Sequence, residues 1–166
     1  MTRVLIVAPS WVGDAILAQP LFMRLHERIP DLELDVLAPA WTLPLFKRMP
    51  EVSGTIANPF EHGDLKLLAR RELGLQIAKQ KYQRALVLPN SFKSALAPWF
   101  AGIPSITGYS GEKRGWIISD CRDLDKAGIP YELLTFPDEG HGIYKAGNRQ
   151  KLLERMDAFF GAAFNT

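Results

Sequence analysis

Short apolar runs alternate with longer amphipathic stretches along most of the chain. The run RVLIVAP (residues 3–9) is almost entirely apolar and rich in β-branched residues, which is typical of a strand buried on both faces of a parallel sheet. Weaker runs of the same kind recur further along the chain. The strands predicted in this way cover residues 3–9, 33–39, 52–59, 84–90, 104–109 and 131–137.

The stretches between these runs show helical spacing instead. In residues 10–30, apolar side chains recur at positions 16, 17, 21 and 25, with the period of a helix. Asp14 is the predicted N-cap. Pro20 indicates a late start or a kink, because proline lacks the N–H that a helix interior needs. Further helices are predicted within residues 40–50, 63–82, 91–102 and 148–164.

Strands that alternate with helices predict parallel βαβ units. We therefore expect a single α/β domain over residues 1–166, a Rossmann- or flavodoxin-like three-layer sandwich with a mostly parallel sheet of about five or six strands. The least regular stretch, residues 111–130, carries no predicted element.

Composition narrows the functions that need consideration. The 166 residues carry a formal net charge of +2, which is too small by itself to indicate nucleic acid or membrane binding. No apolar run is long enough to span a membrane. The single cysteine, Cys121, excludes an intrachain disulfide, and both features favour a cytoplasmic protein. The chain has neither a nucleotide-binding glycine motif nor zinc-type spacing of His and Cys, so no cofactor and no metal are expected.

The turn SWVGD (Ser10 to Asp14) lies between the first predicted strand and the first predicted helix. In a doubly wound sheet, ligands bind at the carboxyl ends of the strands, near helix N-termini. The Asp14 carboxylate can act there as a general base for a hydroxyl group, or it can serve only as a helix cap. Trp11 falls in this candidate cleft, whereas the tryptophans at positions 41, 99 and 116 are interpreted as packing residues.

A second polar stretch, NSFKS, follows the strand predicted at residues 84–90. Asn90 and Ser91 before a helix, with Lys93 in its first turn, form an anion cradle in one interpretation and ordinary N-caps in the other. The stretch GEKRG adds Glu112 and Arg114, either as a border of the same site or as a solvated loop. The basic residues of the 63–82 stretch are interpreted as a solvated face: Lys66, Arg70, Arg71, Lys79 and Lys81.

Several long stretches within residues 1–125 resemble one family, in order along the chain. They are APSWVGDAILAQPLF, DVLAPAWTLPLFKRMPEV, HGDLKLLARRELG, YQRALVLPNSFKSALAPWFAGIP and TGYSGEKRG. This part of the chain resembles the N-terminal domain of the bacterial ADP-heptose:lipopolysaccharide heptosyltransferases, notably those of the heptosyltransferase II type. These enzymes are similar to other GT-B glycosyltransferases, in which two Rossmann-like domains face a cleft.

The resemblance implies a role for the candidate loops. In such enzymes the N-terminal domain receives the lipopolysaccharide acceptor, and the C-terminal domain binds the ADP-sugar. Asp14 matches the aspartate proposed as general base for the acceptor hydroxyl. An inner-core lipopolysaccharide acceptor, an anionic sugar, is the implied partner. The implied acceptor-binding residues are Ser10, Trp11, Gly13, Asn90, Ser91, Lys93, Glu112 and Arg114.

From about residue 126 the resemblance changes. The stretch KAGIPYELLTFPDEGHGIYKAGNRQKLLERMDAFF resembles the C-terminus of α/β-hydrolases of the prolyl oligopeptidase (S9) type, in which the histidine of DEGHG completes a Ser-Asp-His triad. That histidine is His141 here. No serine has glycine at both −2 and +2, as a nucleophile elbow requires, and Ser110 comes nearest. Without a nucleophile, His141 is a vestigial triad member or simply a loop histidine.

The simplest interpretation of two resemblances is a chimera, engineered or selected in a laboratory, that folds but lacks efficient catalysis. A strand and a helix from the tail would cover the edge and the apolar face that truncation of a parallel sheet exposes. Two alternatives stay open. One is a residual acceptor-binding module or a heptosyltransferase that needs a donor domain, and the other is a weak esterase that uses His141. A homodimer through an exposed sheet edge is also open.

Overall fold

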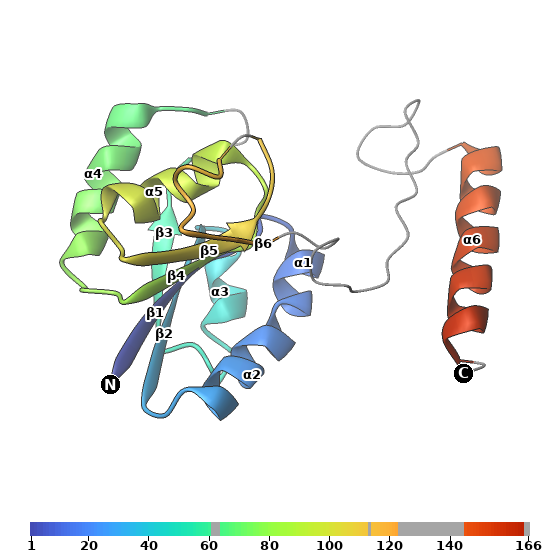
Figure 1. The fold of residues 1–166 in the computed structure, drawn as a ribbon, viewed down its shortest axis with the longest axis horizontal. Coiled ribbons are helices and arrows are strands. Elements are labelled where there is room, and N and C mark those ends of the chain that lie inside the picture. The colour runs from blue at the N-terminus through green and yellow to red at the C-terminus, as the bar shows by residue number, and fades with distance from the viewer. Residues whose placement is uncertain (61–63, 113, 123–144, 165–166) are drawn as a thin grey trace. The chain divides into compact units, whose positions relative to one another are not determined.

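The chain divides into two units, residues 1–127 and 128–166. The computed structural model describes residues 1–60, 64–112, 114–122 and 145–164. The described part of the first unit is a sheet with its helices, and the described part of the second is a single helix (Figure 1). The expectation that residues 1–166 form one domain stays a prediction.

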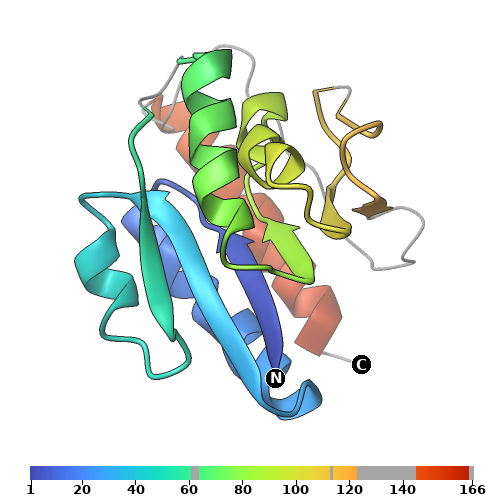
Figure 2. The ribbon, with the colours of Figure 1, turned by 90° about the vertical axis from the view of Figure 1, so that its left-hand side faces the viewer.

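The sheet of the first unit has six strands in the order β3-β2-β1-β4-β5-β6, and every pair is parallel. This confirms the predicted fold class. Strands β3, β2 and β1 run side by side in Figure 2. The strand order reverses between β1 and β4, which is the switch point of a doubly wound sheet. The strands are β1 (Thr2–Val7), β2 (Leu32–Pro39), β3 (Gly54–Asn58), β4 (Arg84–Val87), β5 (Ser105–Tyr109) and β6 (Asp120–Arg122).

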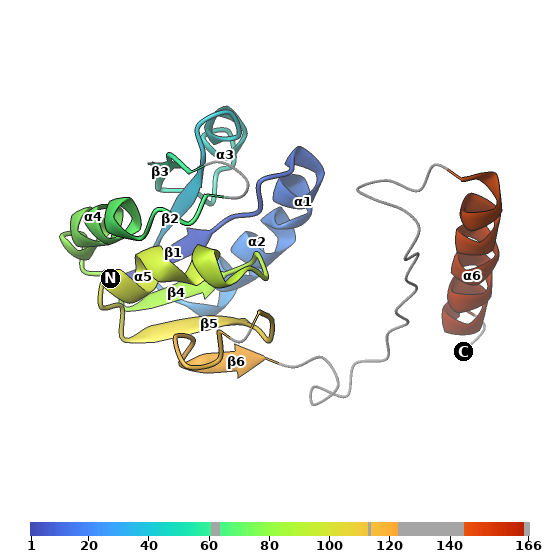
Figure 3. The same cartoon turned by 90° about the horizontal axis from the view of Figure 1, so that it is seen from above.

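Helices cover both faces of the sheet. Figure 3 shows α4 and α5 on one side of the strands and α1, α2 and α3 on the other. A short 3₁₀ helix, η1, leads into α5, and α6 belongs to the second unit. The bounds are α1 (Val12–Leu17), α2 (Gln19–Arg28), α3 (Leu43–Phe46), α4 (Leu67–Ala78), η1 (Phe92–Ala95), α5 (Leu96–Phe100) and α6 (Ala146–Phe164).

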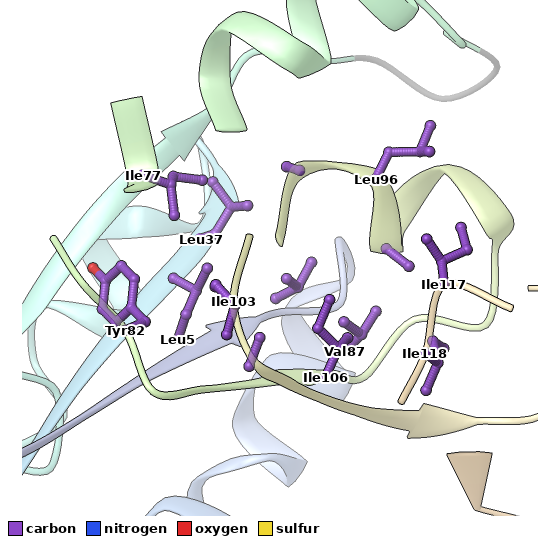
Figure 4. Packing of buried hydrophobic residues seen from close by; sticks show 14 of the residues in the cluster. Leu5, Leu37, Ile77, Tyr82, Val87, Leu96, Ile103, Ile106, Ile117 and Ile118 are labelled. Atoms are coloured by element: carbon purple, nitrogen blue, oxygen red, sulfur yellow. The ribbon is translucent and has the colours of Figure 1, made fainter. Parts of the chain in front are cut away.

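The alternation of side chains along β1 explains why its sequence is apolar from Val4 to Val7. Leu5 and Val7 point into the cluster under α4 and α5, part of which Figure 4 shows. Val4 and Ile6 point into the cluster formed with α1, α2 and α3. Successive side chains of a strand face opposite sides of its sheet, so a central strand between two helical layers needs apolar residues at every position.

The first helical stretch departs from the expected pattern in one respect. Pro20 does mark a break, because α1 ends at Leu17 and α2 starts at Gln19 with the proline in its first turn. The side chains buried here, however, are the small residues Ala15 and Ala18 together with Phe22. Of the larger residues that show the helical period, Leu17 is 77% exposed.

The sixth strand arises from a stretch in which the pattern predicted no element. Residues Asp120–Arg122 pair with β5 in parallel and form one edge of the described sheet, with β3 at the other. The strand expected at residues 131–137 lies outside the described residues. Dimerisation through a sheet edge therefore stays a prediction, and the shortness of β6 limits the pairing it offers.

A charged network lies at the amino end of the strands. Asp35 of β2 is 8% exposed, accepts a hydrogen bond of 2.5 Å from the Tyr82 hydroxyl, and receives the Arg3 guanidinium at 3.3 Å. Burial, helped by this hydrogen bond, raises the pKa of Tyr82. Gly54 on β3 leaves room for the carboxylate, because a Cβ there would lie 2.5 Å from the Asp35 Oδ1 atom.

Candidate functional site at the carboxyl edge of the sheet

Two of the predicted site stretches leave the sheet side by side at the switch point. Strands β1 and β4 are paired in a register that sets Val7 opposite Val87, and the Leu88 N–H donates to the Val7 carbonyl oxygen at 3.1 Å. Ser10 and Asn90 each follow three residues after their paired valine. The two loops therefore begin at the place where doubly wound sheets bind their ligands.

Asp14 lies in the first turn of α1 and is exposed. The helix begins after Trp11 as N-cap, and no side chain makes a capping hydrogen bond there. The prediction that Asp14 is the N-cap is therefore wrong, and so is the alternative that it serves only as a cap. A carboxylate in this position is favoured by the partial positive charge of the helix N-terminus. Gly13 beside it is exposed, and a Cβ added there would contact nothing within 4 Å.

The loop after β4 is capped by a residue from another loop. Ser91 is the N-cap of η1 but makes no side-chain capping bond. Instead the Glu112 carboxylate Oε2 accepts the Phe92 N–H at 2.7 Å. The interpretation of Asn90 and Ser91 as ordinary side-chain caps is thus wrong. Because the Phe92 N–H already donates to Glu112, it is not available to a bound anion. Lys93 is then the cationic group of the predicted anion cradle.

Arg114 is completely buried, with 0% of its surface exposed. Its guanidinium donates to the carbonyl oxygens of Tyr109 at 2.8 and 3.1 Å, of Pro89 at 2.5 Å and of Ser91 at 3.1 Å. The Ser94 Oγ lies at 3.2 Å from the same group. Burial lowers the pKa of Arg114, yet a guanidinium stays protonated at neutral pH. For Arg114 the solvated-loop interpretation is wrong, since this side chain joins the loops that follow β4 and β5.

Two glycines allow close packing beside these loops. A Cβ on Gly111 would lie 2.9 Å from the Asn90 carbonyl oxygen. A Cβ on Gly108 would lie 3.0 Å from the Ile118 Cδ1 atom and 3.2 Å from the Val87 carbonyl oxygen. The backbone after β5 therefore fits against the Asn90 carbonyl group only because Gly111 has no side chain, while Gly108 allows close packing of β5 itself against β4 and Ile118.

Arg70 supports the same loop from the helical layer. Only 4% of Arg70 is exposed, and its guanidinium donates to the carbonyl oxygens of Asp64, Leu65 and Lys93 at 2.9, 2.7 and 3.0 Å. It also stacks over the Phe60 ring, at 4.1 Å from the ring centroid. The interpretation of a solvated basic face is therefore wrong for Arg70. This role could not be predicted from the sequence, because the acceptors are backbone carbonyls.

The tryptophans also depart from expectation. Trp11 is 59% exposed, as a residue of a candidate cleft allows, but Trp41, Trp99 and Trp116 are exposed by 60%, 41% and 68%. The interpretation of these three as packing residues is wrong in the sense of core residues, although Trp99 and Trp116 contact neighbouring aromatic rings.

The remaining predicted site residue, His141, lies outside the described residues, so the esterase hypothesis stays a prediction. Within the described ranges, no three His, Cys, Asp or Glu side chains gather in a way that would hold a metal ion. Nor is any helix in those ranges both long enough and apolar enough to pass through a bilayer.

Two family models match different parts of the chain. Residues 70–133 match Glycosyltransferase family 9 (heptosyltransferase), and residues 119–166 match the Prolyl oligopeptidase family. The two matches overlap between residues 119 and 133, within the stretch where the resemblance was expected to change.

Curated relatives match the N-terminal part at high identity. Lipopolysaccharide heptosyltransferase 2 of Escherichia coli K12 is 50% identical over 128 residues, which cover 77% of this chain and 37% of the relative. The Salmonella typhimurium protein of the same name is 49% identical over 128 residues, with the same shares. The chain thus spans little more than a third of the length of these relatives.

Solved structures agree with the fold of this part. The structure of E. coli ADP-heptose LPS heptosyltransferase II superimposes with a TM-score of 0.68 at 47% identity, over 76% of this chain and 36% of that one. A glycosyl transferase family 9 protein from Veillonella parvula gives a TM-score of 0.66 at 18% identity, over 75% of this chain and 37% of that one. The second likeness concerns the fold alone.

Proposed function

We propose that this chain binds the sugar acceptor of a lipopolysaccharide heptosyltransferase, as the acceptor-side part of such an enzyme. The observation that carries the proposal is the 50% identity to lipopolysaccharide heptosyltransferase 2 over 128 residues. Those residues cover 77% of the chain. This is about the length of the first unit, residues 1–127, which carries the carboxyl-edge loops. An inner-core lipopolysaccharide acceptor is anionic and rich in hydroxyl groups, so it needs both hydrogen-bonding partners and cations.

The carboxyl edge offers this chemistry at the switch point. Ser10 and Asn90 begin the two neighbouring loops, and Lys93 supplies a positive charge in the second. Arg114 and Glu112 hold that second loop in place through the hydrogen bonds described above. In the proposed site, Ser10, Trp11, Gly13, Asn90, Ser91 and Lys93 face the acceptor, while Glu112 and Arg114 position the loop.

Asp14 is the proposed general base. Its carboxylate would take the proton of the acceptor hydroxyl while the hydroxyl oxygen attacks the anomeric carbon of an ADP-linked heptose. The bond between that carbon and the ADP oxygen then breaks, and ADP leaves with the electron pair. Groups that stabilise the departing ADP belong to a donor domain in this proposal, so transfer requires that such a domain be supplied.

Binding can be tested with the chain as it is. A two-dimensional amide NMR spectrum of the labelled protein would be recorded during titration with a soluble Kdo-containing inner-core oligosaccharide. We expect saturable shifts in Ser10–Asp14 and Asn90–Ser94. Lys93→Ala should weaken binding about tenfold, because a charge-assisted hydrogen bond contributes about 1.5 kcal/mol or more.

The matched control is Lys79→Ala. Lys79 is an exposed lysine that follows the last residue of α4, far along the helix from the carboxyl edge. Its removal should change the dissociation constant less than twofold. Equal losses of affinity from both lysines would show only a general charge effect, and the absence of saturable shifts in the two loops would refute the proposed function.

The chimeric origin and the absence of efficient catalysis remain a second hypothesis for the whole chain. The observation that favours it is the match of residues 119–166 to a different family, Prolyl oligopeptidase. On this view the hydrolase-like tail is a structural addition, and the chain hydrolyses nothing. Turnover of p-nitrophenyl acetate above background, lost in His141→Ala, would instead support the esterase hypothesis.

A further inference from the structure

An aromatic cluster borders the loop that carries Lys93, and its two tryptophans are exposed whereas its two phenylalanines are partly buried against the core. It consists of Phe92, Trp99, Phe100 and Trp116, which come from η1, α5 and the connection between β5 and β6. The Trp116 ring centroid lies 5.8 Å from that of Phe92 and 5.8 Å from that of Trp99, and the second pair is T-shaped at 78°. Trp99 and Phe100 are 4.9 Å apart.

The cluster exposes apolar surface that a folded protein normally removes from water. Trp116 is 68% exposed and Trp99 is 41% exposed, although tryptophan gains more from burial than any smaller side chain. Trp116 also contacts Phe92, and Trp99 also contacts Phe100, yet both indoles keep this exposed surface. Exposed aromatic rings that contact one another point to a binding surface rather than to scattered surface residues.

The backbone that carries Trp116 is fixed on both sides. Arg114 is fully buried, and Ile117 and Ile118 are only 4% and 3% exposed and lie in the core cluster shown in Figure 4. The N–H groups of Ile117 and Ile118 both donate to the Arg114 carbonyl oxygen, at 3.0 and 3.2 Å. Gly115 and Trp116 are therefore exposed between the buried Arg114 and the buried Ile117 and Ile118. The backbone on both sides and the ring contacts with Phe92 and Trp99 hold the Trp116 ring in place before any ligand arrives.

The polar groups next to the cluster decide which partner it fits. Phe92 is flanked in sequence by Ser91 and Lys93, and its N–H meets the Glu112 carboxylate. An aromatic face beside hydroxyl, carboxylate and ammonium groups matches a sugar ring. The C–H face of a pyranose packs on the aromatic ring, while its hydroxyl and anionic groups find hydrogen-bonding partners at the rim.

We propose that Trp116, with Trp99 and Phe92, forms a stacking subsite for a pyranose ring of the acceptor. The inference rests on the proposed function. It extends the proposed acceptor site to the surface beside the Asn90–Lys93 loop, where the sugar ring would pack. Trp116→Ala should lower the affinity about tenfold, as expected for a central aromatic contact. Trp116→Phe keeps a flat ring and should recover most of the affinity.

The experiment follows the four indole N–H signals during titration with the Kdo-containing inner-core oligosaccharide. Single Trp→Phe variants assign the signals. The indoles of Trp99 and Trp116 should shift saturably, with the same dissociation constant as the backbone amides of Ser91 and Lys93. Trp41→Ala is the control, since Trp41 is equally exposed at 60% but lies outside the cluster, and it should change the affinity less than twofold.

The outcomes separate this inference from the proposed function. Backbone shifts in the two loops without shifts of the Trp99 and Trp116 indoles would overturn the stacking subsite and leave acceptor binding intact. A spectrum that does not respond anywhere would overturn both. Indole shifts that depend on protein concentration without the oligosaccharide would show that the cluster joins two copies of the chain, which also overturns the inference.

Discussion

Replacement of Arg114 tests whether one buried side chain holds the candidate site together. Arg114→Met fills a similar volume but removes the donors to the carbonyl oxygens of Pro89, Ser91 and Tyr109. Each carbonyl left without a partner costs about 1–3 kcal/mol. Part of that loss is offset, because the variant no longer buries a guanidinium. We expect a net loss of about 3–5 kcal/mol, as when one partner of a buried charged group is removed.

Urea unfolding measures the effect. With an m-value of about 2 kcal/mol/M, the unfolding midpoint should fall by roughly 2 M. Arg122→Met is the matched control, because the Arg122 side chain is 67% exposed and, among the residues that the structure describes, pairs with Asp120 alone, across 2.8 Å in β6. Its effect should stay within about 1 kcal/mol. A change of the same size in both variants would refute the view that Arg114 joins the two loops.

Three further results are expected. Because burial and the Asp35 hydrogen bond raise the pKa of Tyr82, its contribution to stability is complete below about pH 10, the ordinary tyrosine pKa, and is lost as the pH rises above it. Tyr82→Phe should therefore flatten the fall of the urea midpoint above about pH 10, and an unchanged fall would contradict this. Gly74→Ala should cost about 1–3 kcal/mol despite the better helix propensity of alanine, since the new Cβ would lie 2.5 Å from the Phe100 Cβ and 2.9 Å from the Ala97 carbonyl oxygen. Gly13→Ala, with nothing within 4 Å, should be neutral or stabilising in the same assay. Deletion of residues 126–166 should leave an insoluble or molten remnant if the chain is one domain, and a cooperative calorimetric transition of the shortened chain would contradict this.

The strands from β1 to β5 and the location of the candidate site were predictable from the sequence for a common reason. Strands β1, β2 and β4 are buried on both faces, so they consist mainly of apolar residues, and such apolar runs are visible directly in the sequence. The carboxyl ends of parallel strands meet at one edge, so polar residues that follow two such strands are expected to lie near each other. The register of Val7 with Val87 then confirmed that Ser10 and Asn90 begin neighbouring loops.

The features that escaped prediction depend on contacts that a single sequence does not show. Strand β6 has only three residues, Asp120–Arg122, and no apolar run, and it joins the sheet through backbone pairing with β5. Arg70 was interpreted as solvated, and for Arg114 a solvated loop was one of two interpretations, because the partners of both side chains are carbonyl oxygens of other segments. The interpretation of Trp116 as a packing residue followed the general preference of aromatic residues for the interior, whereas the following Ile117 and Ile118 occupy the core instead.

The amino end of the sheet carries a stabilising ionic network and the carboxyl end carries the candidate site. This separation has a consequence for sequence divergence and for engineering. The ionic network of Arg3, Asp35 and Tyr82 lies toward the amino end, and the candidate loops begin after Val7, which is four residues, or about 13 Å, along β1 from Arg3. Substitutions that far apart usually have additive effects. Stabilising substitutions at the amino end can therefore offset the stability that is lost when substitutions in the loops change specificity, so that the domain stays folded.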